Sequence, residues 1–150
     1  MATYTEEVGN KLNELLERTY DAEKGYKKAA ENVNHLGLKS YFNNKAQQRY
    51  DFGHELKTEI KNFGQEVNKG GSAAGTLHRV WMDTKALFSS ENEESMLEES
   101  IRGEKAAISE YNDVMGDLNL PSSTKSILQD QKSKIETGLN TIKGLEDIVD

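Results

Sequence analysis

The sequence has no cysteine, one proline and no long apolar run. The lack of cysteine excludes disulfides, thiolate catalysis, Cys-ligated zinc and iron–sulfur clusters. No stretch approaches the ~18 consecutive apolar residues of a membrane span, and the N-terminus lacks a basic segment followed by an apolar run, as a secretory signal would have. Positive charge is also scarce, since 19 Lys and Arg against 26 Asp and Glu give a net charge of −7. We therefore expect a cytoplasmic protein that binds neither nucleic acid nor a membrane surface.

Helical periodicity dominates what is present. The chain is long enough for one domain, 1–150, and its single proline and 30% charged residues favour long, exposed helices. Apolar residues recur at spacings of three and four over 5–34, 38–66, 91–117 and the residues after Pro121. Thr3 and Glu6 have the form of a capping box, Gly70–Gly71 would stop the second helix, and Pro121 suits the first position of the fourth. The sequence predicts four amphipathic helices.

The connections between these segments predict the topology. The turns around 34–37 and 117–121 are short, which makes the helices that they join antiparallel. About 23 residues, from Val67 to Ser90, separate the second and third segments. They include an expected short helix over 74–88 and could span roughly 45 Å, the length of a bundle. Two antiparallel hairpins joined by one long crossover are the ferritin-like four-helix bundle, an all-α fold.

One polar residue interrupts the apolar stripe of each helix near its middle: Glu23, Arg49, Glu104 and Gln131. Because charged residues are almost never fully buried unless paired, we expect these four to meet inside the bundle. Arg49 would neutralise Glu23, Glu104 or both, and Gln131 would complete the hydrogen-bonded cluster.

The same positions bear on metal binding. Di-metal bundles take one Glu from each of two helices and a Glu-x-x-His from each of the other two. Glu23 and Glu104 stand where the single Glu ligands would stand. The other four ligand positions hold Arg49, Phe52, Gln131 and Lys134, and an Arg has no lone pair to give to a metal. We therefore expect a structural cluster and no cofactor; weak binding of a divalent ion through Glu23 and Glu104 is the alternative.

Other motifs point to no catalytic residue. Asp51 and His54 have the spacing of a helical metal pair, but they lie roughly 160° from the apolar stripe, so they should face solvent. Tyr26 and Tyr111 lie on apolar stripes, where core packing is expected. Trp81, on the expected crossover helix, would pack across the bundle or form the contact with a second copy or a protein partner.

Several stretches together resemble a known family. They are Leu12-Asn13-Glu14-Leu15, Asp21-Ala22-Glu23-Lys24-Gly25-Tyr26, Arg49 with Glu55-Leu56, Gly75-Thr76-Leu77-His78-Arg79-Val80-Trp81-Met82-Asp83, and Arg102-Gly103-Glu104. Over about residues 8–118 the chain resembles an uncharacterised bacterial ferritin-like four-helix-bundle family, a domain of unknown function related in fold to rubrerythrin. The resemblance implies the ferritin-like fold and no assigned activity. Relatives of that fold carry iron through six ligands, and this chain departs from the pattern at four of them.

Together these observations predict a non-catalytic helical bundle with a degenerate metal site. Its role would be that of a stress-associated protein or an interaction module. The alternative is a degenerate metalloprotein that holds a divalent ion weakly.

Overall fold

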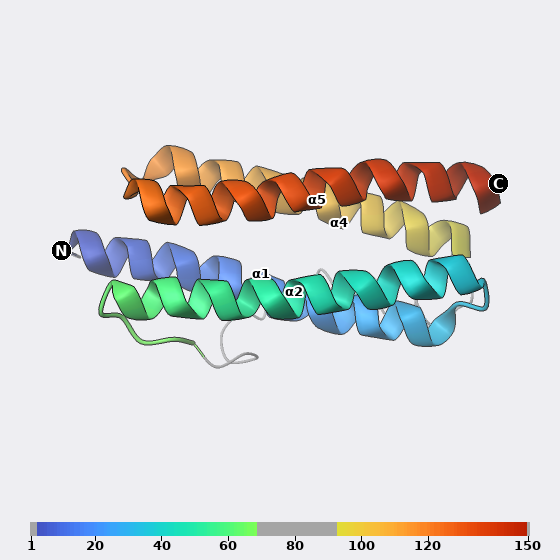
Figure 1. Cartoon of the computed structure of the whole chain (residues 1–150), viewed down its shortest axis with the longest axis horizontal. Helices are drawn as coiled ribbons and strands as arrows, with labels where there is room; N and C mark the ends of the chain where they lie inside the picture. Colours follow the sequence, from blue (N-terminus) through green and yellow to red (C-terminus); the bar gives the residue numbers. More distant parts are fainter. Residues whose placement is uncertain (1–2, 69–92, 150) are drawn as a thin grey trace.

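The computed structural model describes residues 3–68 and 93–149, which form four long helices (Figure 1). The helices are α1 (Tyr4–Asn32), α2 (Leu36–Asn62), α4 (Glu93–Asp117) and α5 (Ser122–Val149). The prediction of an all-α protein with four long helices is confirmed. The short helix expected over 74–88, together with Trp81, lies outside the described residues.

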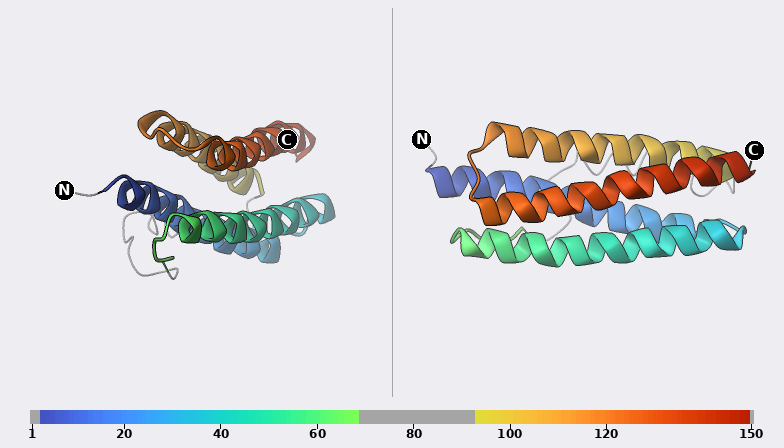
Figure 2. Two further views of the ribbon diagram at one scale, coloured as in Figure 1. Left: turned by 60° about the vertical axis from the view of Figure 1, so that its left-hand side comes forward. Right: turned by 45° about the horizontal axis from the view of Figure 1, so that its top comes forward.

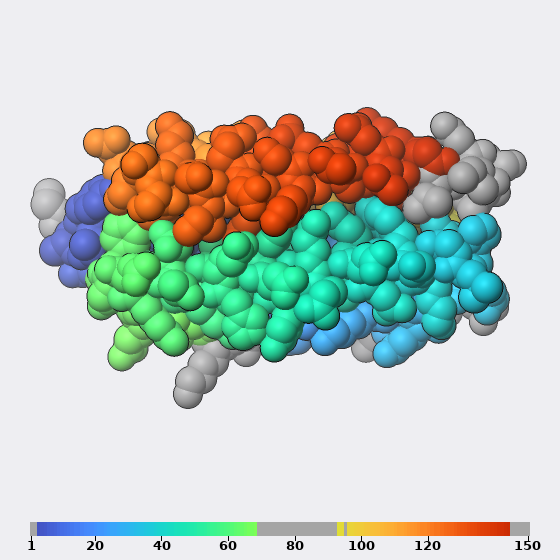
Figure 3. Space-filling view, in the orientation of Figure 1, coloured from blue at the N-terminus to red at the C-terminus, as the bar shows by residue number. Residues whose placement is uncertain are grey.

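The helices pair as two antiparallel hairpins, α1 with α2 and α4 with α5. The hairpins lie one above the other as two layers (Figure 2). Contact between the layers is made by α1 with α4 and by α2 with α5, and α5 lies along α2 on the face shown in Figure 3. Helices α2 and α4 run in the same direction, so the end of α2 and the start of α4 lie at opposite ends of the molecule.

Helices α1 and α5 begin close to the residues that the sequence predicts, with a shift of one residue at α5. The Thr3 hydroxyl accepts a hydrogen bond from the backbone N–H of Glu6 at 3.3 Å, as the capping box predicts. Pro121 precedes the first residue of α5 and does not occupy the first helical position. Its carbonyl accepts the first hydrogen bond of that helix, from the N–H of Lys125 at 2.9 Å.

Helix α2 ends earlier than the sequence predicts. It ends at Asn62, before the expected stop at Gly70–Gly71, and Gly64 follows with a φ of 73°. The N–H of Gly64 bonds the carbonyl of Lys61 at 2.9 Å, and the N–H of Gln65 bonds that of Ile60 at 3.1 Å. This is a Schellman motif, which needs a residue in the left-handed region, and glycine adopts that region without steric cost.

The turn between α1 and α2 is held by the first residue of α4. The Glu93 carboxylate accepts hydrogen bonds from the backbone N–H groups of Asn34 and His35, each at 3.1 Å. The His35 ring then caps α2 by accepting from the N–H of Leu38 at 3.3 Å. The two hairpins are thus joined at this end of the molecule by a carboxylate and two backbone groups.

The apolar core has two parts. One cluster lies toward the α1–α2 turn and includes Tyr26, Phe42, Met96 and Ile142. The other lies toward the α4–α5 turn and is formed by the remaining lengths of the same helices, Val8 to Leu16 of α1 and Leu128 to Ile135 of α5 among them. Between the two clusters, along both α2 and α4, the chain buries charged residues.

Candidate functional site

Two of the residues singled out in the sequence, Arg49 of α2 and Glu104 of α4, meet in the centre of the molecule. Their side chains are 3% and 1% exposed. The Arg49 Nη2 group donates a hydrogen bond to Glu104 Oε1. This buried ion pair joins one hairpin to the other, and the other residues of the site surround it.

Lys45, which the sequence reasoning missed, is the second cation of this centre. Its Nζ lies 3.5 Å from Glu104 Oε2 and donates a hydrogen bond to Gln48 Oε1 at 2.7 Å. Lys45 is four residues before Arg49, and therefore lies one helical turn away on the same face of α2. Gly138 on α5 leaves the space that Lys45 fills, since a Cβ at Gly138 would overlap its Nζ.

A tyrosine and a serine extend the hydrogen bonding around one oxygen of the carboxylate. The Tyr26 hydroxyl donates to Glu104 Oε1 at 2.5 Å. Ser100 Oγ donates to the Tyr26 hydroxyl at 3.2 Å. Tyr26 packs in the apolar core as expected, but its hydroxyl also bonds a buried charge. We call the residues of this site the central polar layer: Tyr26, Lys45, Gln48, Arg49, Ser100 and Glu104.

Gln131 is fully buried, but it bonds a different set of residues. Its Oε1 accepts from the Tyr111 hydroxyl at 2.6 Å. Its Nε2 donates to Glu55 Oε1 at 3.0 Å and to the Phe52 carbonyl at 3.4 Å. Gln131 thus ties α5 to α2 and α4, next to the central polar layer along the bundle.

Glu23 lies apart from the other three predicted residues. Its carboxylate is 15% exposed and pairs with Lys27, one turn along α1, at 2.8 Å. Glu23 also lines a shallow surface pocket between α1 and α2 with Tyr50 and Asn43. The carboxylates of Glu23 and Glu104 therefore have separate cationic partners.

Burial and charge shift the pKa values of the central polar layer. Burial lowers the pKa of Lys45 to about 8, against the opposing effect of the Glu104 carboxylate. Burial also opposes the charge on Arg49, but Glu104 outweighs it and the pKa of Arg49 is raised. Burial, and then Glu104, raise the pKa of Tyr26 well above its ordinary value, which keeps its hydroxyl a donor. Two cations thus face one carboxylate.

This donor set does not fit a metal ion. Both oxygens of Glu104 face cationic groups, and a divalent cation would add charge where positive charge is already in excess. Within residues 3–68 and 93–149, no group of three or more His, Asp, Glu or Cys side chains could hold a metal. Phe52 and Lys134 stand at the His positions of a di-metal site. Phe52 is a buried core residue, and Lys134 is exposed and pairs with Asp130.

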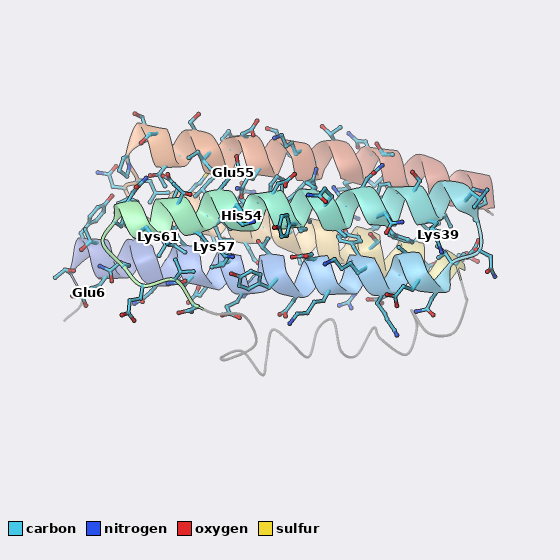
Figure 4. The ribbon with its side chains drawn as sticks, turned by 60° about the horizontal axis from the view of Figure 1, so that its bottom comes forward. Glu6, Lys39, His54, Glu55, Lys57 and Lys61 are labelled. Atoms are coloured by element: carbon cyan, nitrogen blue, oxygen red, sulfur yellow. The ribbon has the colours of Figure 1, made fainter. Side chains whose placement is uncertain are left out.

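The Asp51–His54 pair lies on the surface, as the helical wheel predicts. Both residues are exposed, and Figure 4 shows His54 on the outside of α2. Asp51 accepts a hydrogen bond from Gln47 at 3.1 Å, and the His54 ring lies 4.6 Å from that of Tyr50. The two side chains therefore have separate neighbours.

Comparison with known sequences places the chain in a family. Residues 7–117 match the family described as Domain of unknown function (DUF2383). The chain belongs to this family. The match covers α1, α2 and α4 and ends at the last residue of α4, in agreement with the resemblance noted over about residues 8–118. All six residues of the central polar layer lie within the DUF2383 match, whereas Gly138 and Gln131 lie beyond it on α5.

A comparison with curated proteins gave no significant match. Hydropathy adds one further finding: none of the helices in the described part of this DUF2383 chain has the length and apolar character needed to cross a bilayer.

Proposed function

We propose that this DUF2383 protein is a non-catalytic, ferritin-like helical bundle of one domain, 1–150, in which an ion-paired cluster replaces the di-metal site. In this proposal the bundle is a rigid scaffold, and its role is that of a stress-associated protein or an interaction module. Its topology supports the ferritin-like relation. Two antiparallel hairpins follow one another with α2 and α4 parallel, which is the arrangement of ferritin-like bundles.

The observation that carries the proposal is the surroundings of Glu104. In a di-metal bundle a carboxylate at this depth binds cations from the medium. Here Arg49 and Lys45 supply the positive charge from within the chain, and Tyr26 donates to the same carboxylate. Removing Arg49 would leave a buried carboxylate short of a partner, so we expect the loss of this one side chain to destabilise the fold.

Elemental analysis tests the proposal. Protein purified without chelators from cells supplied with iron and manganese should retain far less than one metal ion per chain after dialysis. Two variants locate any metal that is retained. Metal lost on His54→Ala is held at the surface and leaves the proposal standing. Stoichiometric metal that is lost on Glu104→Gln would show that the centre is a metal site and would overturn it.

A further inference from the structure

The chain that leaves α2 is fastened to α1. The side-chain amide of Asn13 donates a hydrogen bond to the carbonyl of Glu66 at 2.9 Å and accepts one from the backbone N–H of Asn68 at 2.9 Å. One turn earlier on α1, Gly9 leaves the space that the side chain of Gln65 occupies. Figure 4 shows this stretch, at the end of α2, crossing α1. The connection between the two hairpins therefore starts on the outer side of α1.

The far end of the same connection is also held at α1. Glu93, the first residue of α4, accepts hydrogen bonds from the backbone N–H groups of Asn34 and His35, just after the last turn of α1. The length of α1 between the two anchors, from Asn13 to Asn32, is roughly 30 Å. Residues 69–92 join these anchors, and the shortest path between them follows α1.

One carboxylate on this side of α1 is buried without a cation. Glu17 follows Asn13 by one helical turn, and Asp21 follows Glu17 by another. Glu17 lies about 160° around the helix from the core residue Leu15, so it faces away from the interior of the bundle. Its side chain is nevertheless only 5% exposed, and its Oε1 atom accepts no hydrogen bond. Among residues 3–68 and 93–149, no Lys or Arg pairs with it.

The connection itself carries cations. A buried carboxylate is strongly unfavourable without a positive partner, and the sequence between 69 and 92 contains Lys69, Arg79 and Lys85. Arg79 is nearest to the middle of the connection. Its guanidinium has enough donors to serve two carboxylates that lie one helical turn apart, as Glu17 and Asp21 do.

We propose that the face of α1 formed by Asn13, Glu17 and Asp21 is the docking surface for the connection 69–92, and that Arg79 is the cation that pairs with Glu17. The occupant is a segment of the same chain because both of its ends are already held at α1 and its cations complement the two carboxylates. This inference goes beyond the proposed function. It also gives the partner contact expected near Trp81 a location, on the α1 side of the molecule.

Limited digestion of the full chain with trypsin tests the docking surface, with mass spectrometry to count cuts within 69–92. Glu17→Lys should speed these cuts at least fivefold, because it places a cation opposite Arg79. Glu17→Gln only removes the charge and should give a smaller increase. Glu136→Lys makes the same charge reversal at an exposed position of α5 and should leave the rate unchanged. Equal rates in the wild type and both Glu17 variants would overturn the proposal.

A charge exchange tests the choice of Arg79. Arg79→Glu should also speed the remaining cuts within 69–92, and combining it with Glu17→Lys should restore at least half of the lost protection. Lys69→Glu and Lys85→Glu, each combined with Glu17→Lys, are the matched controls and should restore none. Rescue by either of these in place of Arg79→Glu, or by no combination, would overturn the pairing of Arg79 with Glu17.

Discussion

Lys45 on α2 passes directly over Gly138 on α5, and the fit depends on the missing side chain of that glycine. A Cβ at Gly138 would overlap Nζ of Lys45 and lie 3.2 Å from its Cε. The close approach lets a buried ammonium group reach Gln48 and Glu104. It also brings α5, which lies beyond the DUF2383 match, into contact with the central polar layer.

Gly138→Ala should therefore destabilise the protein, although alanine is the better helix former. We expect a loss of about 1–3 kcal/mol in the free energy of unfolding, because the new methyl group displaces a buried charged group. Gly144→Ala on the same helix is the matched control. Nothing lies within 4 Å of its added Cβ, so it should stabilise by up to about 1 kcal/mol.

Urea unfolding of both variants measures the difference. Combining Gly138→Ala with Lys45→Ala should recover part of the loss, because the overlap is then removed. Equal effects of the two glycine variants would contradict the close contact.

Arg49→Ala should destabilise the protein by about 3–5 kcal/mol, because Glu104 then keeps only the more distant Lys45 as a charged partner. Lys134→Ala is the control, since it removes an exposed ion pair with Asp130 and should cost less than about 1 kcal/mol. Chemical denaturation at neutral pH measures both values. A loss below about 1 kcal/mol for Arg49→Ala would mean that the guanidinium is not a structural part of the centre.

The lowered pKa of Lys45 predicts a rise in stability at alkaline pH. Its pKa is about 8 in the folded protein against an ordinary value of 10.5, so between these values the unfolded chain binds the extra proton. The free energy of unfolding therefore increases as pH rises from about 8 toward 10, by on the order of 2–3 kcal/mol from this group. At lower pH both states are charged and the contribution is absent.

The difference in the free energy of unfolding between the wild type and Lys45→Met, measured across this pH range, isolates the contribution of Lys45, since other groups titrate alike in both proteins. Lys125→Met, at an exposed position of α5, controls for the loss of one positive charge. If the free energies of unfolding of Lys45→Met and the wild type change in parallel from pH 7 to 10, burial does not lower the pKa of Lys45 as described.

The expected partner contact near Trp81 remains a prediction from the sequence. If a second copy or a protein partner binds through that segment, Trp81→Ala should reduce the sedimenting mass. Leu36→Ala is a suitable control, because Leu36 is 80% exposed at the α1–α2 turn. A wild-type assembly that sediments unchanged after Trp81→Ala would remove that contact from consideration.

The helices and the central ion pair could be predicted because both depend on the period of one helix. Arg49 and Glu104 lie within their apolar stripes, so burial and pairing follow. Glu23 also interrupts its apolar stripe, but its carboxylate pairs with Lys27 one turn away on the same helix. A helical wheel gives the direction of a side chain but not the partner that it finds.

The missed residues depend on packing between helices. Lys45 is buried because Gly138 faces it across the α2–α5 contact, and no pattern within either helix records that pairing. Similarly, the hydroxyl of Tyr26 reaches Glu104 only because α4 lies beside α1. The stop of α2 was misplaced because the glycine pair at 70–71 is the stronger sequence signal, although Gly64 has the required conformation.

The ion pair between Arg49 and Glu104 has a consequence for how the hairpins align lengthwise. Apolar side chains tolerate many apolar neighbours. Two purely apolar helix surfaces could therefore shift against each other by one helical turn at a small cost in free energy. A guanidinium displaced by about 5.4 Å would instead face hydrocarbon, and its carboxylate would be stranded. The buried charges thus favour one lengthwise alignment of the two hairpins among the several that hydrophobic contact alone would permit.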